Sequence, residues 1–103
     1  MQQIITNCSD FTRGVARFVR IATNAKTGVE AWRRSYKFKP YLDVVEFIVP
    51  QGGRFYPEEN RITRRIPARD PKLREKMEFY LQNGIDGWFE GDEPKGIFDD
   101  DDE

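Results

Sequence analysis

Residues 32–39 read Trp-Arg-Arg-Ser-Tyr-Lys-Phe-Lys, so aromatic and cationic side chains are interleaved in one short segment. On a β-strand, alternate side chains point to opposite faces, which places the three rings and Arg34 on one face and the other cations on the second. Such rings stack on unpaired bases, at about 1–3 kcal/mol per base, while cations follow the phosphates. The segment is a candidate platform for single-stranded nucleic acid; the alternative is that the rings form the core.

A second cationic segment follows the glycine turn at residues 52–53. Planar guanidinium groups fit phosphate oxygens and stack on rings, so we expect this segment to close over an anionic partner. Ion pairing with Glu58, Glu59, Asp70 and the acidic end of the chain is the alternative. The complete set of predicted nucleic-acid-binding residues is Arg17, Arg20, Trp32, Arg33, Arg34, Tyr36, Lys37, Phe38, Lys39, Arg54, Phe55, Tyr56, Arg61, Arg64 and Arg65.

The net charge of −1, from 17 basic and 18 acidic side chains, hides a division of charge along the chain. Residues 1–76 carry 16 basic and 8 acidic side chains, a net charge of +8, whereas residues 77–103 carry 1 and 10, a net charge of −9. A cationic body favours an anionic partner. We expect residues 1–91 to form one globular domain and residues 92–103 a disordered acidic tail.

The tail combines an apolar pair with a run of acids. Such a run keeps a protein soluble, binds a basic partner, or competes with an anionic ligand for the body. The adjoining Ile97 and Phe98 favour docking to a protein pocket. The predicted protein-docking residues are Ile97, Phe98, Asp99, Asp100, Asp101, Asp102 and Glu103.

Histidine is absent and Cys8 is the only cysteine. Imidazole-based catalysis is therefore excluded, and one thiol forms neither an internal disulfide nor a zinc site. Asp43 and Glu46 are candidates for a Mg²⁺-dependent nuclease, but no lysine follows Glu46 at the spacing typical of such enzymes. We expect a protein that is not an enzyme and that uses no cofactor and no metal.

The composition also bears on the core and on location. A content of 38% hydrophobic residues, with 14% aromatic, supports a small core built largely from rings. No segment reaches the roughly 20 apolar residues that cross a bilayer, and the N-terminal residues lack the pattern of a secretory signal. The expected location is therefore intracellular and cytoplasmic.

Local signals predict the elements that position these residues. Asp70 as N-cap, Pro71 in the first turn and Gly84 as a stop indicate a helix over residues 71–83. The apolar run at residues 41–49 predicts a strand at the centre of a sheet. Short strands are expected at residues 2–6 and 61–66.

Residues 15–23 and 29–38 fit a β-hairpin around the turn at residues 24–28. The alternative is a helix, because Phe11, Val15, Phe18, Val19 and Ala22 also follow helical spacing. β-Branched residues favour the hairpin. The predicted fold is α+β: an antiparallel sheet or partly open OB-like barrel of 4–5 strands plus one C-terminal helix.

The hairpin at residues 15–38, together with the basic, aromatic body and the acidic tail, resembles the small phage-type single-stranded-DNA-binding proteins. The resemblance implies an OB-like fold, a viral role in DNA replication, a preference for DNA over RNA, and a replication or host protein bound through the tail. We expect non-catalytic binding of single-stranded nucleic acid, modulated by the tail. The alternative is a small viral regulator that binds a host protein.

Overall fold

The hairpin expected in the first half of the chain is present. In the computed structural model, which describes residues 9–51, 57, 60–61 and 64–92, Asn24 accepts hydrogen bonds at Oδ1 from the backbone N–H groups of Lys26 (2.9 Å) and Thr27 (3.0 Å). Gly28 adopts a φ of 78°, which favours glycine. This turn joins two antiparallel strands, so the helical alternative is wrong.

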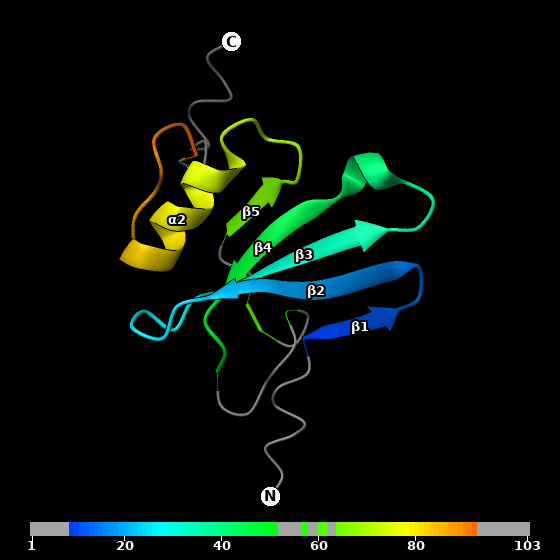
Figure 1. The fold of residues 1–103 in the computed structure, drawn as a ribbon, viewed down its shortest axis with the longest axis horizontal. Coiled ribbons are helices and arrows are strands. Elements are labelled where there is room, and N and C mark those ends of the chain that lie inside the picture. Colours follow the sequence, from blue (N-terminus) through cyan, green and yellow to red (C-terminus); the bar gives the residue numbers. More distant parts are fainter. Residues whose placement is uncertain (1–8, 52–56, 58–59, 62–63, 93–103) are drawn as a thin grey trace, which may run out of the picture.

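Five strands follow one another across a single antiparallel sheet, in the order β1-β2-β3-β4-β5 (Figure 1). The elements are β1 (Asp10–Arg13), β2 (Ala16–Thr23), β3 (Glu30–Tyr36), the 3₁₀ turn η1 (Pro40–Leu42), β4 (Val44–Ile48), β5 (Arg64–Pro67) and α2 (Leu73–Asn83). The α+β class with an antiparallel sheet is confirmed. The middle strand is β3, so the prediction that residues 41–49 form the centre was wrong by one strand.

The sheet is open over the part of the chain that the structure describes. Each strand pairs with its neighbours in sequence, and β1 is not paired with β5. OB folds are Greek-key barrels, whereas these five strands form a meander. An OB-like barrel is therefore not confirmed. The expected strand at residues 2–6 lies outside the described residues, and β1 was not predicted.

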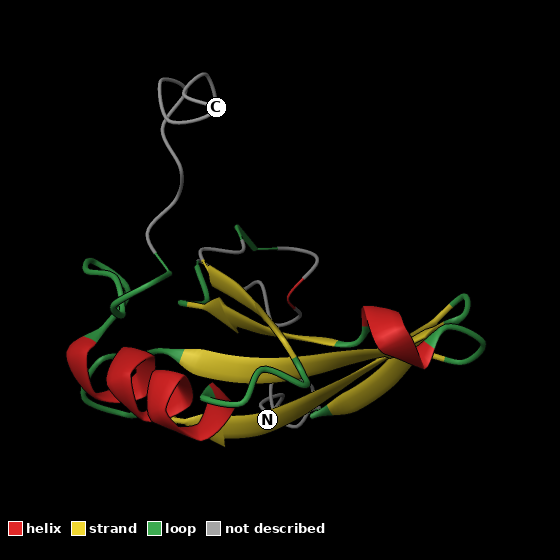
Figure 2. Ribbon diagram, turned by 90° about the horizontal axis from the view of Figure 1, so that it is seen from above, coloured by secondary structure: helices red, strands yellow, loops and turns green. Residues whose placement is uncertain are grey.

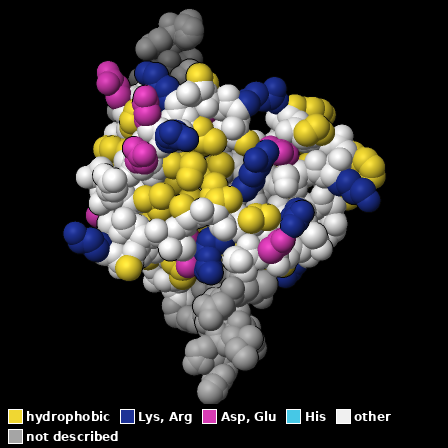
Figure 3. Space-filling view, viewed as in Figure 1, with side chains coloured by type: hydrophobic (Ala, Val, Ile, Leu, Met, Phe, Trp, Pro, Cys, Tyr) yellow, Lys and Arg dark blue, Asp and Glu magenta, His cyan; other side chains and the backbone are white. Residues whose placement is uncertain are grey.

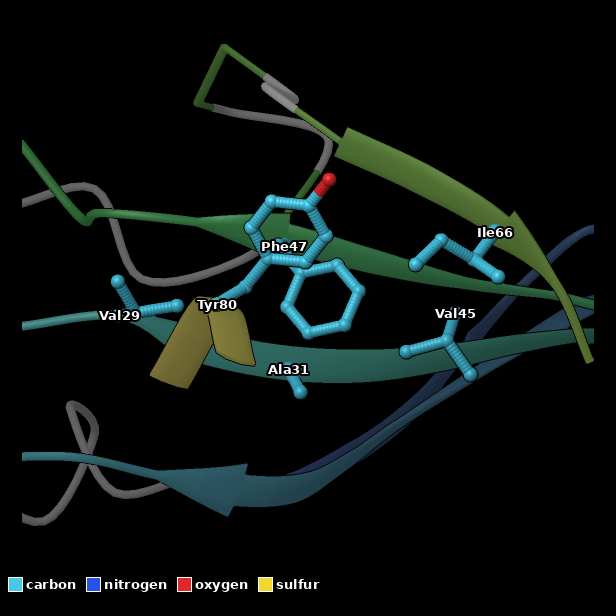
Figure 4. Close-up of a cluster of buried hydrophobic side chains, with 6 residues drawn as sticks. All are labelled: Val29, Ala31, Val45, Phe47, Ile66 and Tyr80. Atoms are coloured by element: carbon cyan, nitrogen blue, oxygen red, sulfur yellow. The ribbon is translucent and has the colours of Figure 1, made fainter. Parts of the chain in front are cut away.

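The helix α2 packs on one face of the sheet, over one of its ends, as Figure 2 shows. Val29, Ala31, Val45, Phe47 and Ile66 are buried beneath it with Tyr80 of the helix. The rings of Phe47 and Tyr80 lie 5.4 Å apart, side by side in Figure 4. This cluster is the core on the helix side.

The opposite face carries a second buried cluster. Ala16, Phe18, Trp32 and Ile48 form it, because these positions alternate with the helix-facing ones along their strands. The rings of Phe11 and Phe18 are stacked 4.7 Å apart. Both faces of the central strands are therefore buried.

The helix begins two residues later than predicted. Asp70 accepts a hydrogen bond at Oδ1 from the Lys72 N–H (2.7 Å), and Pro71 and Lys72 lie in a turn before the first helical residue, Leu73. Gly84 ends the helix at a φ of 85°, with its N–H bonded to the Tyr80 carbonyl. The predicted C-terminal stop is confirmed.

A polar cluster ties the segment after α2 to the helix. Lys76 Nζ lies 2.7 Å from Asp70 Oδ2 and 2.9 Å from Asp92 Oδ1. Tyr80 Oη accepts a hydrogen bond from the Phe89 N–H (3.0 Å) and donates one to Asp92 Oδ2 (3.2 Å). Asp92 is therefore held at the surface of α2.

These contacts predict how stability depends on pH. The Lys76 side chain lowers the pKa of Asp70, the two carboxylates raise the pKa of Lys76, and burial raises the pKa of Tyr80. The Asp70 contribution to stability is lost as pH falls below about 4, and those of Lys76 and Tyr80 as pH rises above about 10.

Urea titrations at a series of pH values measure this dependence. We expect a constant free energy of unfolding between about pH 5 and 9 and a decline on both sides. Tyr80→Phe should make the alkaline decline shallower while losing about 1 kcal/mol at neutral pH, because both of its hydrogen bonds are removed. An alkaline decline as steep as that of the native chain would contradict the role given to Tyr80.

Candidate nucleic-acid interface

Most of the predicted nucleic-acid-binding arginines have carboxylate partners within the fold. The ion pairs are Arg17–Asp10, Arg20–Glu30 (3.4 Å), Arg33–Asp43 (3.3 Å), Arg34–Glu46 (3.3 Å) and Arg65–Glu46 (3.2 Å). Cross-strand register explains them, since each of these five arginines lies near an acid on an adjacent strand or connection. Their charge is therefore partly compensated internally.

Arg64 binds other parts of the fold through its guanidinium group. Its guanidinium donates to the carbonyls of Ile85 (2.7 Å) and Gly87 (2.6 Å) and lies 3.3 Å from the centre of the Trp88 ring. The side chain thereby fastens the segment after α2 to β5. A planar guanidinium can stack on a base in the same way, but the guanidinium of Arg64 stacks on Trp88.

Trp32 is a core residue, which corrects its assignment to the binding set. Its side chain is 0% exposed, and its indole N–H donates to Glu30 Oε1 at 2.9 Å. A ring without accessible surface cannot stack on a base. The core interpretation of the aromatic segment is therefore right for Trp32.

Phe38, unlike Trp32, is exposed to solvent. Its ring is 73% exposed, and Tyr41, which sequence analysis did not select, is 61% exposed. Both lie in the connection from β3 to β4, at the end of the sheet far from α2 (Figure 1). Residues 32–38 were predicted to share one strand, but β3 ends at Tyr36. Phe38 therefore lies in the following turn and does not continue the face formed by Trp32, Arg34 and Tyr36.

The surface at this end is formed by residues 12–17 and 35–42, here called the distal surface. These two segments contain Arg13, Arg17, Lys37 and Lys39, and the acids at their edges, Asp10 and Asp43, pair with Arg17 and Arg33. Figure 3 shows hydrophobic and Lys or Arg side chains close together at the corresponding end of the molecule. Among the described residues, Lys37 and Lys39 make no ion pair, and Lys37 lies over the Phe38 ring at 5.4 Å.

Two adjoining grooves cross the distal surface. One, of about 390 Å³, is lined by Val15, Tyr36, Phe38, Lys39 and Leu42. The other, of about 380 Å³, is lined by Thr12, Gly14, Val15, Ala16, Arg17, Ser35, Tyr36 and Lys37. Val15 and Tyr36 belong to both grooves, so the apolar hollow continues directly into one whose walls also include Arg17 and Lys37.

Backbone hydrogen bonds fix the walls of these grooves. Lys37 N–H donates to the Val15 carbonyl (3.1 Å), and Tyr36 N–H donates to Asp43 Oδ1 (3.1 Å). Gly14, at a φ of 65°, makes the β1–β2 turn that presents Val15. Arg69 donates to the Tyr41 carbonyl at 2.7 Å, which holds η1 in place.

The structure brings together only part of the predicted set. Tyr36, Lys37, Phe38, Lys39 and Arg17 meet at the distal surface, whereas the exposed Arg61 lies in a separate groove with Val49, Gln51 and Ile85. Arg54, Phe55, Tyr56 and the docking residues 97–103 lie outside the described residues. Sequence analysis missed Val15 and Leu42, although each stands next to a chain-reversing segment.

The described residues were also searched for metal sites and membrane-spanning helices, and the sequence and fold were compared with those of known proteins. The described residues contain no group of three or more Cys, Asp or Glu residues placed to hold a metal ion. No helix among them is long and apolar enough to cross a membrane. Comparisons with protein-family models, curated proteins and solved structures find no match.

Proposed function

We propose that this protein binds single-stranded nucleic acid without catalysis, through the distal surface. The observation that carries the proposal is that Lys37 and Lys39, which make no ion pair among the described residues, lie beside exposed aromatic rings at one end of the sheet. Single-strand binders use the same two components, a cationic track for phosphates and rings for bases. The resemblance to phage-type single-stranded-DNA-binding proteins supports the same proposal and favours DNA.

The acidic tail modulates this binding in the proposed scheme. Residues 97–103 carry five acids, and a run of carboxylates competes with phosphates for the same cations. Removal of residues 93–103 should therefore tighten binding. The deletion begins after Asp92 because Asp92 contacts Lys76 and Tyr80.

Salt dependence tests the proposal. Fluorescence anisotropy of a labelled oligonucleotide should give a linear decrease of log affinity with log salt, with a slope of about −1.4 if Lys37 and Lys39 each neutralise one phosphate. The double variant Lys37→Gln with Lys39→Gln should reduce the slope by about 1.4. Lys26→Gln with Arg74→Gln removes the same charge outside the distal surface and should leave the slope unchanged.

Two results would count against the proposal. Absence of binding at low salt, even after deletion of residues 93–103, would end it. Equal loss of slope in both double variants would show that binding follows net charge and not the distal surface. Either result would leave the surface without a role in nucleic-acid binding.

A second candidate function is regulation of another protein, and the aliphatic walls Val15 and Leu42 favour it. They are 59% and 44% exposed, and exposed aliphatic residues that line a groove are typical of protein docking sites. A pull-down from nuclease-treated lysate tests this candidate. A stoichiometric protein partner that is released by Leu42→Ser and retained by Ile21→Ser would support it.

A further inference from the structure

The apolar groove of the distal surface differs from a flat stacking platform. Its walls come from the β1–β2 turn (Val15), the end of β3 (Tyr36), and the connection through η1 (Phe38 and Leu42). Its volume of about 390 Å³ falls within the range of small-ligand pockets, which is about 300–1,000 Å³. A hollow of this size has room for a single small group.

The groove is built before any ligand arrives. Arg34 lies 5.5 Å from the centre of the Tyr36 ring and is itself held by Glu46, a carboxylate that is 0% exposed. The backbone on both sides of Tyr36 is tied to Val15 and Asp43. A preformed wall lowers the ordering cost of binding.

The charge around the groove selects the kind of ligand. Lys39 lines it directly, and Lys37 and Arg17 line the adjoining groove. Among the described residues that line the two grooves there is no carboxylate. The complementary ligand is a flat, apolar group that carries anionic groups on either side of it along a chain.

We infer that this groove is a pocket for one unpaired nucleobase, with the flanking phosphates at Lys37 and Lys39. This inference rests on the proposed function and adds the feature of the nucleic acid that is recognised. An unpaired base enters the groove, whereas a base in a duplex is stacked and paired and does not. Single strands are thus selected by their accessible bases as well as by their charge.

The test compares two labelled single strands with the same number of phosphates and the full-length protein. One is an oligothymidylate of about 12 nucleotides, within the site sizes of single-strand binders. The other carries abasic residues at its central positions. We expect the oligothymidylate to bind at least about 5-fold more tightly, the ratio that corresponds to the lower bound for one stacked base.

Matched variants assign the difference to the groove. Leu42→Ser should reduce the ratio of the two affinities towards one and leave binding of the abasic strand unchanged. Ile21→Ser is the control, because Ile21 has a similar exposure (42% against 44%) and lies outside the groove. Both positions are exposed, so thermal melts should show both variants folded.

The outcomes separate the inference from the function on which it rests. Equal affinity for the two strands, with salt-dependent binding of both, would overturn the base pocket and leave the proposed function intact. Binding of neither strand at low salt would overturn the proposed function itself. An unchanged ratio in Leu42→Ser would place base recognition elsewhere and reject this groove.

Discussion

Trp32→Ala should lower the free energy of unfolding by about 3–5 kcal/mol, the range expected when a fully buried aromatic side chain is truncated. Trp32 is 0% exposed in the middle strand, where it packs with Phe18 and Ile48 and lies 5.9 Å from the Phe11 ring. Truncation leaves a cavity on the face of β1–β4 that is opposite α2. Because small domains are stable by only about 5–15 kcal/mol, this loss brings the chain close to unfolding at physiological temperature.

Two variants serve as comparisons for Trp32→Ala: Phe38→Ala, at an exposed ring of the same segment, and Trp32→Phe. Phe38→Ala should change stability by less than about 0.5 kcal/mol, because the ring is 73% exposed. Trp32→Phe keeps most of the buried area and loses the hydrogen bond to Glu30, at about 1 kcal/mol. Urea denaturation measures all three variants. A Trp32→Ala protein as stable as Phe38→Ala would show that Trp32 is accessible and restore it as a candidate for base stacking.

Glu46→Ala is the second large effect, with an expected loss of about 3–5 kcal/mol. Glu46 is 0% exposed, and its Oε2 accepts hydrogen bonds from Arg34 (3.3 Å) and Arg65 (3.2 Å). Its removal leaves Arg34, whose side chain is only 30% exposed, without a counter-charge. An uncompensated charge at this depth costs more than the pair contributes when intact.

Two further variants separate the loss of charge from the loss of volume. Glu46→Leu combined with Arg34→Met replaces the ion pair with apolar side chains and should recover part of the stability lost in Glu46→Ala. Glu78→Ala, at an exposed position on α2, should stay within about 0.5 kcal/mol of the native chain. If the apolar double variant were less stable than Glu46→Ala, uncompensated charge would not be the cause of the loss.

The same ion pair links stability to the distal surface. Glu46 holds Arg34, and Arg34 lies over both Phe18 and Tyr36, the ring that lines both grooves. A variant at Glu46 is therefore expected to weaken oligonucleotide binding through Tyr36 as well as to destabilise the sheet. The exposed groove variants provide the cleaner test of binding, since they leave this network intact.

Local signals in the sequence account for most of the secondary structure. The turn at residues 24–28 is correctly placed because the Asn24 side-chain oxygen forms it within five residues. The helix end at Gly84 is correctly placed because a positive φ at that residue ends the helix. The strand β1 was missed because it is short and its residues are mostly exposed, so it has no apolar pattern of its own. It exists because Phe11 packs against Phe18 across the pair.

The sequence by itself determined the hairpin, the helix, the α+β class and the separation of a cationic body from an acidic end, because these depend on nearest neighbours and on composition. Only the tertiary structure decided which rings and cations are accessible. The register of β2, β3, β4 and β5 sets Arg20, Arg34 and Arg65 beside carboxylates far away in sequence. The same register buries Trp32, while the end of β3 at Tyr36 leaves Phe38 in solvent. Alternation along a strand specifies the face of a side chain, but what covers that face depends on contacts that no local pattern contains.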